Sequence, residues 1–108
     1  MNRSIKESDW KLFKIISKSA LDKYCKESLK RVHEFLAETD AEPFDTTSKI
    51  FDFMKSRRKL QSSIFDDYRR STASHQLILM AREGLLEDSE LSDLSEELKK
   101  QIGVAMTI

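Results

Sequence analysis

The stretch Ser8–Glu38, SDWKLFKIISKSALDKYCKESLKRVHEFLAE, decides the fold of this chain. Its apolar side chains recur three and four residues apart, which is the spacing of one helical face. They are Trp10, Phe13, Ile16, Ala20, Leu21, Tyr24, Cys25, Leu29, Val32, Phe35 and Leu36. Ser8 and Asp9 suit a helix start, because a short oxygen-bearing side chain accepts from free backbone N–H groups and an acid complements the helix dipole. We therefore predict one long helix from about Asp9 to Glu38; Ser19 and Asp22, at capping-box spacing, mark a place for a restart.

The middle of the chain predicts two further helical segments. Thr39–Pro43 offers no apolar period, and the residue before a proline avoids the helical region, so this segment is a linker. A second helix is capped by Asp45, Thr46 or Thr47. Its apolar face comprises Ile50, Phe51, Met54 and, after a polar gap, Leu60. A third segment runs from Ile64 to Met80. We expect a bend or break at Gln61–Ser63.

The last third predicts one or two short helices. Gly84 follows a helix-compatible run and takes the left-handed conformation that ends a helix. Asp88 or Ser89 caps a short helix, and Ser95 begins another that ends near Gly103. The fold class is therefore all-α: an elongated antiparallel bundle in a single domain over residues 1–108, with a long first helix and bent second and third helices. Residues 1–7 and 104–108 are expected to be flexible tails.

The charges exclude a strongly basic protein. Nineteen Lys and Arg balance nineteen Asp and Glu, so the chain lacks the bulk positive field that nonspecific nucleic-acid binding needs. Net charge is nevertheless uneven along the chain. Residues 1–38 carry nine basic and six acidic side chains, residues 39–82 carry eight and six, and residues 83–108 carry two and seven. The C-terminal third is thus acidic, and it faces either the chain's own basic helices or a basic partner.

No pattern of metal or catalytic residues is present. His33 and His75 lack a second ligand at metal spacing, which excludes a zinc site, and no cofactor motif occurs. Ser71 and Thr72 lie within a helical turn of His75, but no glycine-rich loop supplies an oxyanion hole. An enzyme at these residues is the least favoured reading. Cys25 is interpreted as a small core residue, and a lone cysteine without a signal peptide or membrane span indicates a cytoplasmic protein.

Paired arginines form the one distinctive polar pattern. In a straight helix Arg58 and Arg69 would share a face, where paired guanidinium groups hold carboxylates or phosphates. Asp66 at helical spacing from Arg69 and Arg70 offers the structural alternative of intrahelical ion pairs. The candidate partner or anion face comprises Arg57, Arg58, Asp66, Arg69 and Arg70. Its functional reading, nucleic-acid or anion binding, is the alternative to the function favoured below.

Apolar residues off the main helical face indicate an interface. Unless the short acidic helices cover them, these side chains form a dimer surface or docking groove. They are Leu12, Ile15, Ile78 and Leu86. The favoured function is therefore a small non-enzymatic protein-interaction or regulatory module that presents helix faces as a homodimer. The expected partner is a protein, either a second copy of this chain or another protein.

Two resemblances accompany this reading. The runs Ser8–Lys11, Ala20–Cys25 and Phe65–Ala73 together resemble a set of short bacterial all-helical proteins of no established function, which implies a bacterial cytoplasmic protein and no transferable activity. Leu77–Leu91 is similar to the C-terminal helical-hairpin modules called SHOCT domains. That resemblance implies a role in oligomerisation or docking, although Glu87 and Leu91 replace the usual cap and aromatic residues.

Overall fold

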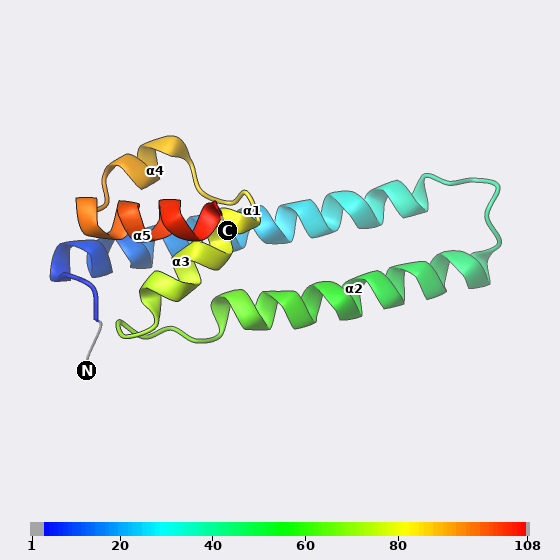
Figure 1. The fold of residues 1–108 in the computed structure, drawn as a ribbon. Coiled ribbons are helices and arrows are strands. Elements are labelled where there is room, and N and C mark those ends of the chain that lie inside the picture. Colours follow the sequence, from blue (N-terminus) through cyan, green and yellow to red (C-terminus); the bar gives the residue numbers. More distant parts are fainter. Residues whose placement is uncertain (1–3, 108) are drawn as a thin grey trace.

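The structure, a computed structural model, describes residues 4–107. These residues form five helices and no strand, so the predicted all-α class is confirmed. The helices are α1 (Glu7–Leu36), α2 (Pro43–Phe65), α3 (Ala73–Arg82), α4 (Asp88–Ser92) and α5 (Glu96–Met106). The molecule measures 53 × 27 × 26 Å, which also confirms the elongated shape (Figure 1).

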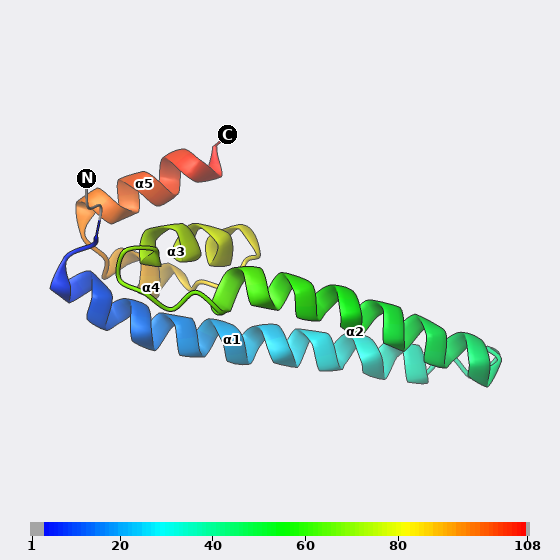
Figure 2. The ribbon, with the colours of Figure 1, turned by 90° about the horizontal axis from the view of Figure 1, so that it is seen from below.

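The long α1 and α2 lie side by side and antiparallel, and the three shorter helices gather at one end of the pair (Figures 1 and 2). α3 packs against both long helices, and α5 packs mainly on α3. We call residues 4–28 and 57–107 the head, and residues 29–56, where α1 and α2 extend beyond the core, the arm. The two parts differ in how far their side chains are buried.

α1 is a single uninterrupted helix, but its start differs from the prediction. It begins at Glu7, after Lys6, whose side chain makes no capping hydrogen bond, and it passes through Ser19 without a restart. Asp9 lies in the first turn of α1, as predicted, and has a second role. Its buried carboxylate accepts hydrogen bonds from the backbone N–H of Ser95, at 2.8 Å, and from the Ser95 hydroxyl, at 2.5 Å. Asp9 thereby joins the two ends of the chain.

The second and third helices are separate rather than one bent helix. α2 begins at Pro43, before the predicted caps, because proline suits the first helical turn, where its missing N–H has no acceptor to lose. α2 ends at Phe65, and a loop over residues 66–72 replaces the break expected at Gln61–Ser63. The buried Gln76 of α3, with its amide nitrogen turned toward α2, donates to the carbonyls of Ser63 and Ile64. This contact satisfies backbone groups that the end of α2 leaves free.

The helix starts and ends predicted after residue 82 were largely correct. Gly84 has a φ of +71°, and the Leu85 N–H that follows it donates to the carbonyl of Met80. α4 is capped by Glu87 in a capping box with Glu90, one residue before the predicted Asp88. Ser95 caps α5 as expected, by accepting from the N–H of Leu98. Gly103 does not end α5, which continues to Met106, so residues 104–106 are helical and not a tail; Ile108 and residues 1–3 lie outside the described residues.

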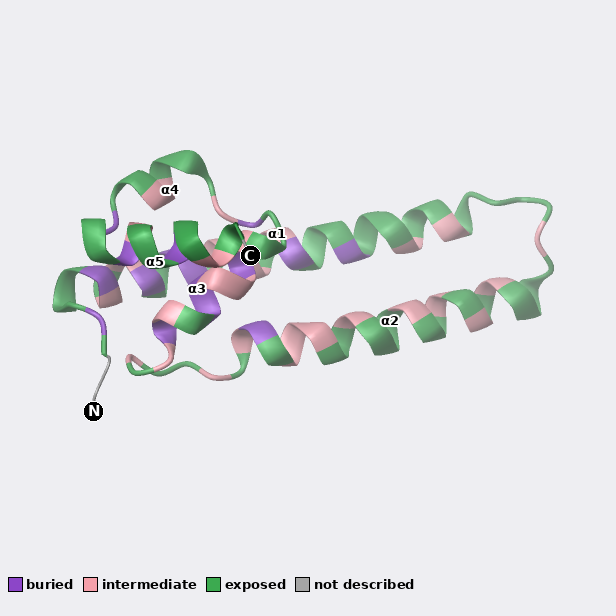
Figure 3. Cartoon of the chain, viewed as in Figure 1, coloured by how far each residue is buried: buried purple, intermediate pink, exposed green. Residues whose placement is uncertain are grey.

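The hydrophobic core lies entirely in the head (Figure 3). α1 contributes its first half, α3 contributes its apolar face, and α5 closes the core from outside. The largest fully buried side chains include Tyr24, Phe13, Ile64, Leu77, Met80, Leu85 and Leu98. The rings of Trp10, Phe13 and Tyr68 stack at one edge of this core, with centroids 5.3 to 5.7 Å apart.

Alanine substitutions at the two glycines should change the free energy of unfolding in opposite directions. Gly84→Ala places a Cβ on a left-handed residue and should lower the free energy of unfolding by about 1–2 kcal/mol. Gly103→Ala is the matched control: it lies inside α5 with nothing within 4 Å of the new Cβ, and it should raise the free energy by about 0.5–1 kcal/mol. Urea denaturation followed by circular dichroism measures both. Equal effects of the two substitutions would contradict the assigned conformation of Gly84.

Candidate functional site

The arm is a pair of helices without a core. No residue from 29 to 56 is buried, although the head on either side of this range is well packed (Figure 3). Large apolar side chains are instead exposed along both helices: Leu29 and Leu36 of α1, and Phe44, Phe51 and Met54 of α2. Phe44 is 78% exposed at the start of α2. Leu29, Phe51 and Met54 also line one groove, and clustered apolar surface of this kind marks an interaction site.

The two helices of the arm meet through side chains that are at most half-buried. The rings of Phe35 and Phe53 meet edge to face, with centroids 5.7 Å apart. Lys49 and Glu38 form an exposed ion pair at 3.5 Å, and such pairs contribute little to stability. Most of the stability of a helix in a protein comes from packing of its apolar face. The arm therefore presents apolar surface that its own fold does not use.

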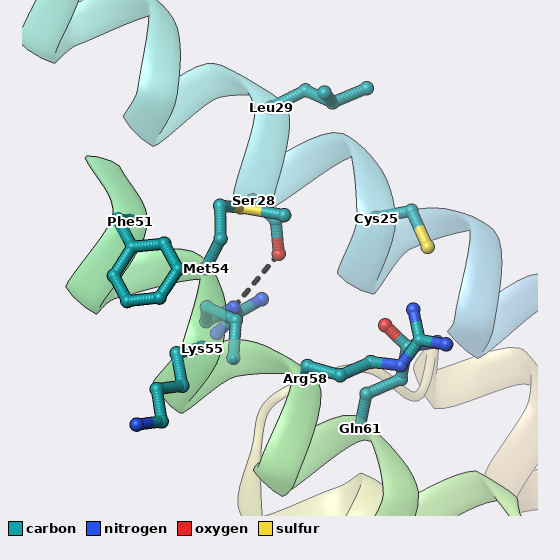
Figure 4. A pocket seen from close by; sticks show the side chains of 9 residues that line it. Cys25, Ser28, Leu29, Phe51, Met54, Lys55, Arg58 and Gln61 are labelled. Atoms are coloured by element: carbon teal, nitrogen blue, oxygen red, sulfur yellow. Dashed lines mark hydrogen bonds between the residues drawn. The ribbon is translucent and has the colours of Figure 1, made fainter. Parts of the chain in front are cut away.

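A groove of about 530 Å³ lies between α1 and α2 at the base of the arm (Figure 4). Its walls are mostly apolar, and basic groups from α2 border it. The lining residues are Cys25, Ser28, Leu29, Phe51, Met54, Lys55, Arg57, Arg58 and Gln61. The groove combines an apolar surface with positive charge, which suits a protein segment that carries apolar and acidic side chains.

Arg57 joins the two helices where the arm meets the head. Its guanidinium lies 3.6 Å from the ring centroid of Tyr24 and donates to the Ser28 hydroxyl at 2.8 Å and to the Tyr24 carbonyl at 3.1 Å. In return, the Tyr24 hydroxyl donates to the Arg57 carbonyl at 2.6 Å. Tyr24 and Ser28 are buried. We call Tyr24, Ser28 and Arg57 the clamp.

Burial of Tyr24 raises the pKa of its hydroxyl, and the neighbouring Arg57 charge opposes this effect. The neutral phenol is therefore the form that the fold stabilises. Folding stability linked to Tyr24 is fully present below its unfolded pKa of 10.0 and is lost as the pH rises through the higher pKa of the folded state.

Cys25 lies in the groove and is exposed, so its interpretation as a core residue is wrong. The prediction failed because the apolar stripe on α1 is wider than the part of the helix that faces the core. Tyr24 faces the core at this turn, and the adjacent residue, 100° further round the helix, faces outward.

The candidate anion face is dispersed in the structure. Arg57 belongs to the clamp and Arg58 borders the groove, whereas Arg69 and Arg70 follow the end of α2. Arg69 pairs with Asp67 at 2.6 Å, which lowers the pKa of that carboxyl, and Arg70 donates to the Ile5 carbonyl and pairs with Glu7. Neither forms the predicted ion pair with Asp66. Because α2 stops at Phe65, Arg58 and Arg69 do not share a helix face.

The predicted apolar interface divides in the same way. Leu12, Ile78 and Leu86 pack against the core, whereas Ile15 is 67% exposed. The exposed residues of α2 that dominate the surface, Phe44, Phe51 and Met54, were read from the sequence as a buried face or were not singled out. These side chains are exposed because α3 and α5 pack in the head and not on the arm. The helical spacing of apolar residues in a sequence does not show which helices will cover them.

The remaining candidates stay apart. His33 and His75 are exposed on different helices, and within residues 4–107 no group of three metal-binding side chains comes together. Across the same residues, every helix is too short or too polar to cross a lipid bilayer.

Comparison with known proteins yields a fold and no family. The sequence matches no protein-family model and no curated protein. The structure is similar to that of the Fluorescence Recovery Protein from Synechocystis sp PCC 6803, with a TM-score of 0.80 over 95% of this chain and 98% of that chain. The two sequences are 17% identical, so the similarity shows that the chains share a fold. The resemblances to short bacterial helical proteins and to SHOCT domains stay predictions.

Two neighbouring arginines test the clamp. Arg57→Ala removes a charged donor from buried acceptors and should lower the free energy of unfolding by about 2–3 kcal/mol. Arg58→Ala, the matched control, should change it by less than about 0.5 kcal/mol. Both are measured by urea denaturation at one low protein concentration, since self-association would otherwise shift the midpoint. Equal losses would show that Arg57 does not hold the helices together.

Tyr24→Phe tests the pH dependence. It should cost about 1 kcal/mol at neutral pH through the lost hydrogen bond to Arg57. It should also reduce the loss of stability as the pH rises above about 10, because the buried phenol no longer titrates. Denaturation midpoints across this range measure the slope. Tyr68→Phe, at an exposed ring, is the control and should leave the slope as in the wild type.

Proposed function

We propose that this protein is a non-enzymatic interaction module that acts through its arm, and that the first partner of the arm is a second copy of the chain. The observation that carries the proposal is the absence of any buried residue from 29 to 56, beside exposed Leu29, Leu36, Phe44 and Phe51. Two arms laid together would give these side chains a shared core. A symmetric dimer requires such a self-complementary surface.

The charge along α2 supports a second copy as the partner. From Pro43 to Asp52 the helix carries two acids, Asp45 and Asp52, and one base, Lys49. From Phe53 to Phe65 it carries four bases and no acid: Lys55, Arg57, Arg58 and Lys59. A two-fold axis across the helix sets its copy antiparallel, so the acidic half of each α2 faces the basic half of the other. The groove, which lies in the basic half, then faces acidic side chains.

The structural comparison supports a role without catalysis. The Fluorescence Recovery Protein shares this fold, and its name describes an effect on fluorescence rather than the conversion of a substrate. We infer that the present chain likewise works by contact with another protein, in a bacterial cytoplasm. The head, with its packed core and acidic C-terminal third, is the rigid support of the arm.

The alternative function, anion or nucleic-acid binding by paired arginines, has less support. It requires Arg57, Arg58, Arg69 and Arg70 on one face, and the structure separates them. Salt distinguishes the two readings, because phosphate contacts weaken steeply as salt rises and apolar association does not.

A charge-exchange experiment tests the dimer. Lys55→Glu with Arg58→Glu makes the basic half of α2 acidic, and Asp45→Lys with Asp52→Lys makes the acidic half basic. Each double variant should be monomeric near 12.6 kDa by light scattering, because like charges then face each other across the axis. An equimolar mixture should restore a dimer of twice that mass.

The wild type is the reference and should be dimeric at the same micromolar concentration. Lys11→Glu with Lys18→Glu, on the exposed face of α1 in the head, is the matched control and should remain dimeric. A monomeric wild type at every accessible concentration would overturn the proposed dimer. A mixture that stays monomeric would overturn the antiparallel pairing of α2.

A further inference from the structure

The arm and the head differ in what stabilises them. In the head, α1, α3 and α5 rest on side chains that are almost fully buried, such as Tyr24, Leu77 and Leu98. Ordering the backbone costs about 1–2 kcal/mol per residue in lost conformational entropy. Along the arm, no buried side chain offsets this cost. A helical segment as short as residues 29–36, the part of α1 in the arm, is marginal in water when nothing packs on it.

The clamp lies at the boundary between these two regions. Ser28 is the last buried residue of α1 toward the tip of the arm, and Ile64 is the only buried residue of α2. Arg57 joins the helices just inside this boundary through three hydrogen bonds and a stacked ring. Beyond it, the helices are joined by the Phe35–Phe53 ring pair, by one exposed ion pair and by side chains that are at most half-buried.

From this distribution we propose that the arm beyond the clamp is stably folded only in the dimer, and that in the monomer α1 and α2 unfold from the tip back to Tyr24, Ser28 and Arg57. The inference rests on the proposed dimer and adds to it a conformational change. Dimerisation then supplies the missing core, and the binding surface forms together with the complex. The concentration of the protein sets how much of the arm exists as helix.

The charge pattern sets the antiparallel orientation of the two α2 helices in the folded dimer. The acidic first half of α2 is farthest from the clamp, and the basic second half is nearest to it. Pairing therefore joins the least anchored half of one arm to the best anchored half of the other. Each clamp supports the part of its partner that most needs support.

Hydrogen exchange of the wild-type chain, followed by mass spectrometry at two concentrations, tests the inference. At a concentration where light scattering reports a dimer, amides of residues 29–36 and 47–56 should be protected. After dilution to the monomer they should exchange at least about tenfold faster, while amides of α3 and α5 should change by less than about twofold. The Lys55→Glu, Arg58→Glu variant provides a monomer at high concentration and should match the diluted wild type.

Each outcome decides a different point. A wild-type dimer whose arm stays equally protected after dissociation overturns this inference and leaves the proposed function standing. A chain that is monomeric at every concentration overturns the proposed dimer and the inference with it. Arg57→Ala should move the boundary of fast exchange in the monomer toward Ala20 and Ile64; a boundary that stays in place overturns the role given to the clamp.

Discussion

The stacked and hydrogen-bonded contact between Arg57 and Tyr24 is the interaction on which the two-part architecture depends. It is the last place where α1 and α2 share buried groups, and it links the packed head to the exposed arm. The guanidinium is well suited to this position, because its planar face covers the ring while its edges donate to Ser28 and to a helix carbonyl. A lysine would supply charge without this geometry.

The sequence predicted the parts of the fold that local physics controls. The apolar period of α1, the left-handed Gly84 and the Ser95 cap each depend on a few neighbouring residues, and each was found in the structure. The end of α2 was misplaced because it depends on Gln76, a residue of another helix that reaches its last carbonyls. The second role of Asp9 was missed for the same reason, since its partner Ser95 lies 86 residues away.

The candidate site was less predictable than the fold. An apolar stripe looks the same in sequence whether the structure covers it or leaves it open, so Phe51 and Met54 were assigned to a buried face. Leu12, Ile78 and Leu86 were offered as surface and pack on the core instead. The arginine pattern failed because it assumed one straight helix through Arg58 and Arg69. In contrast, the charge reversal along α2 is visible in the sequence, and it gains meaning only once the arm is seen to stand alone.

The contact between Asp9 and Ser95 has a consequence for biosynthesis. The ribosome makes Asp9 early and its partner 86 residues later, after α1, α2 and α3 have all been made. Until α5 is released from the exit tunnel, Leu98 and Ile102 cannot close the core, and the apolar sides of α1 and α3 stay open to water. The arm is therefore synthesised before the core of the head can close. The order of synthesis thus delays dimer assembly until α5 has packed.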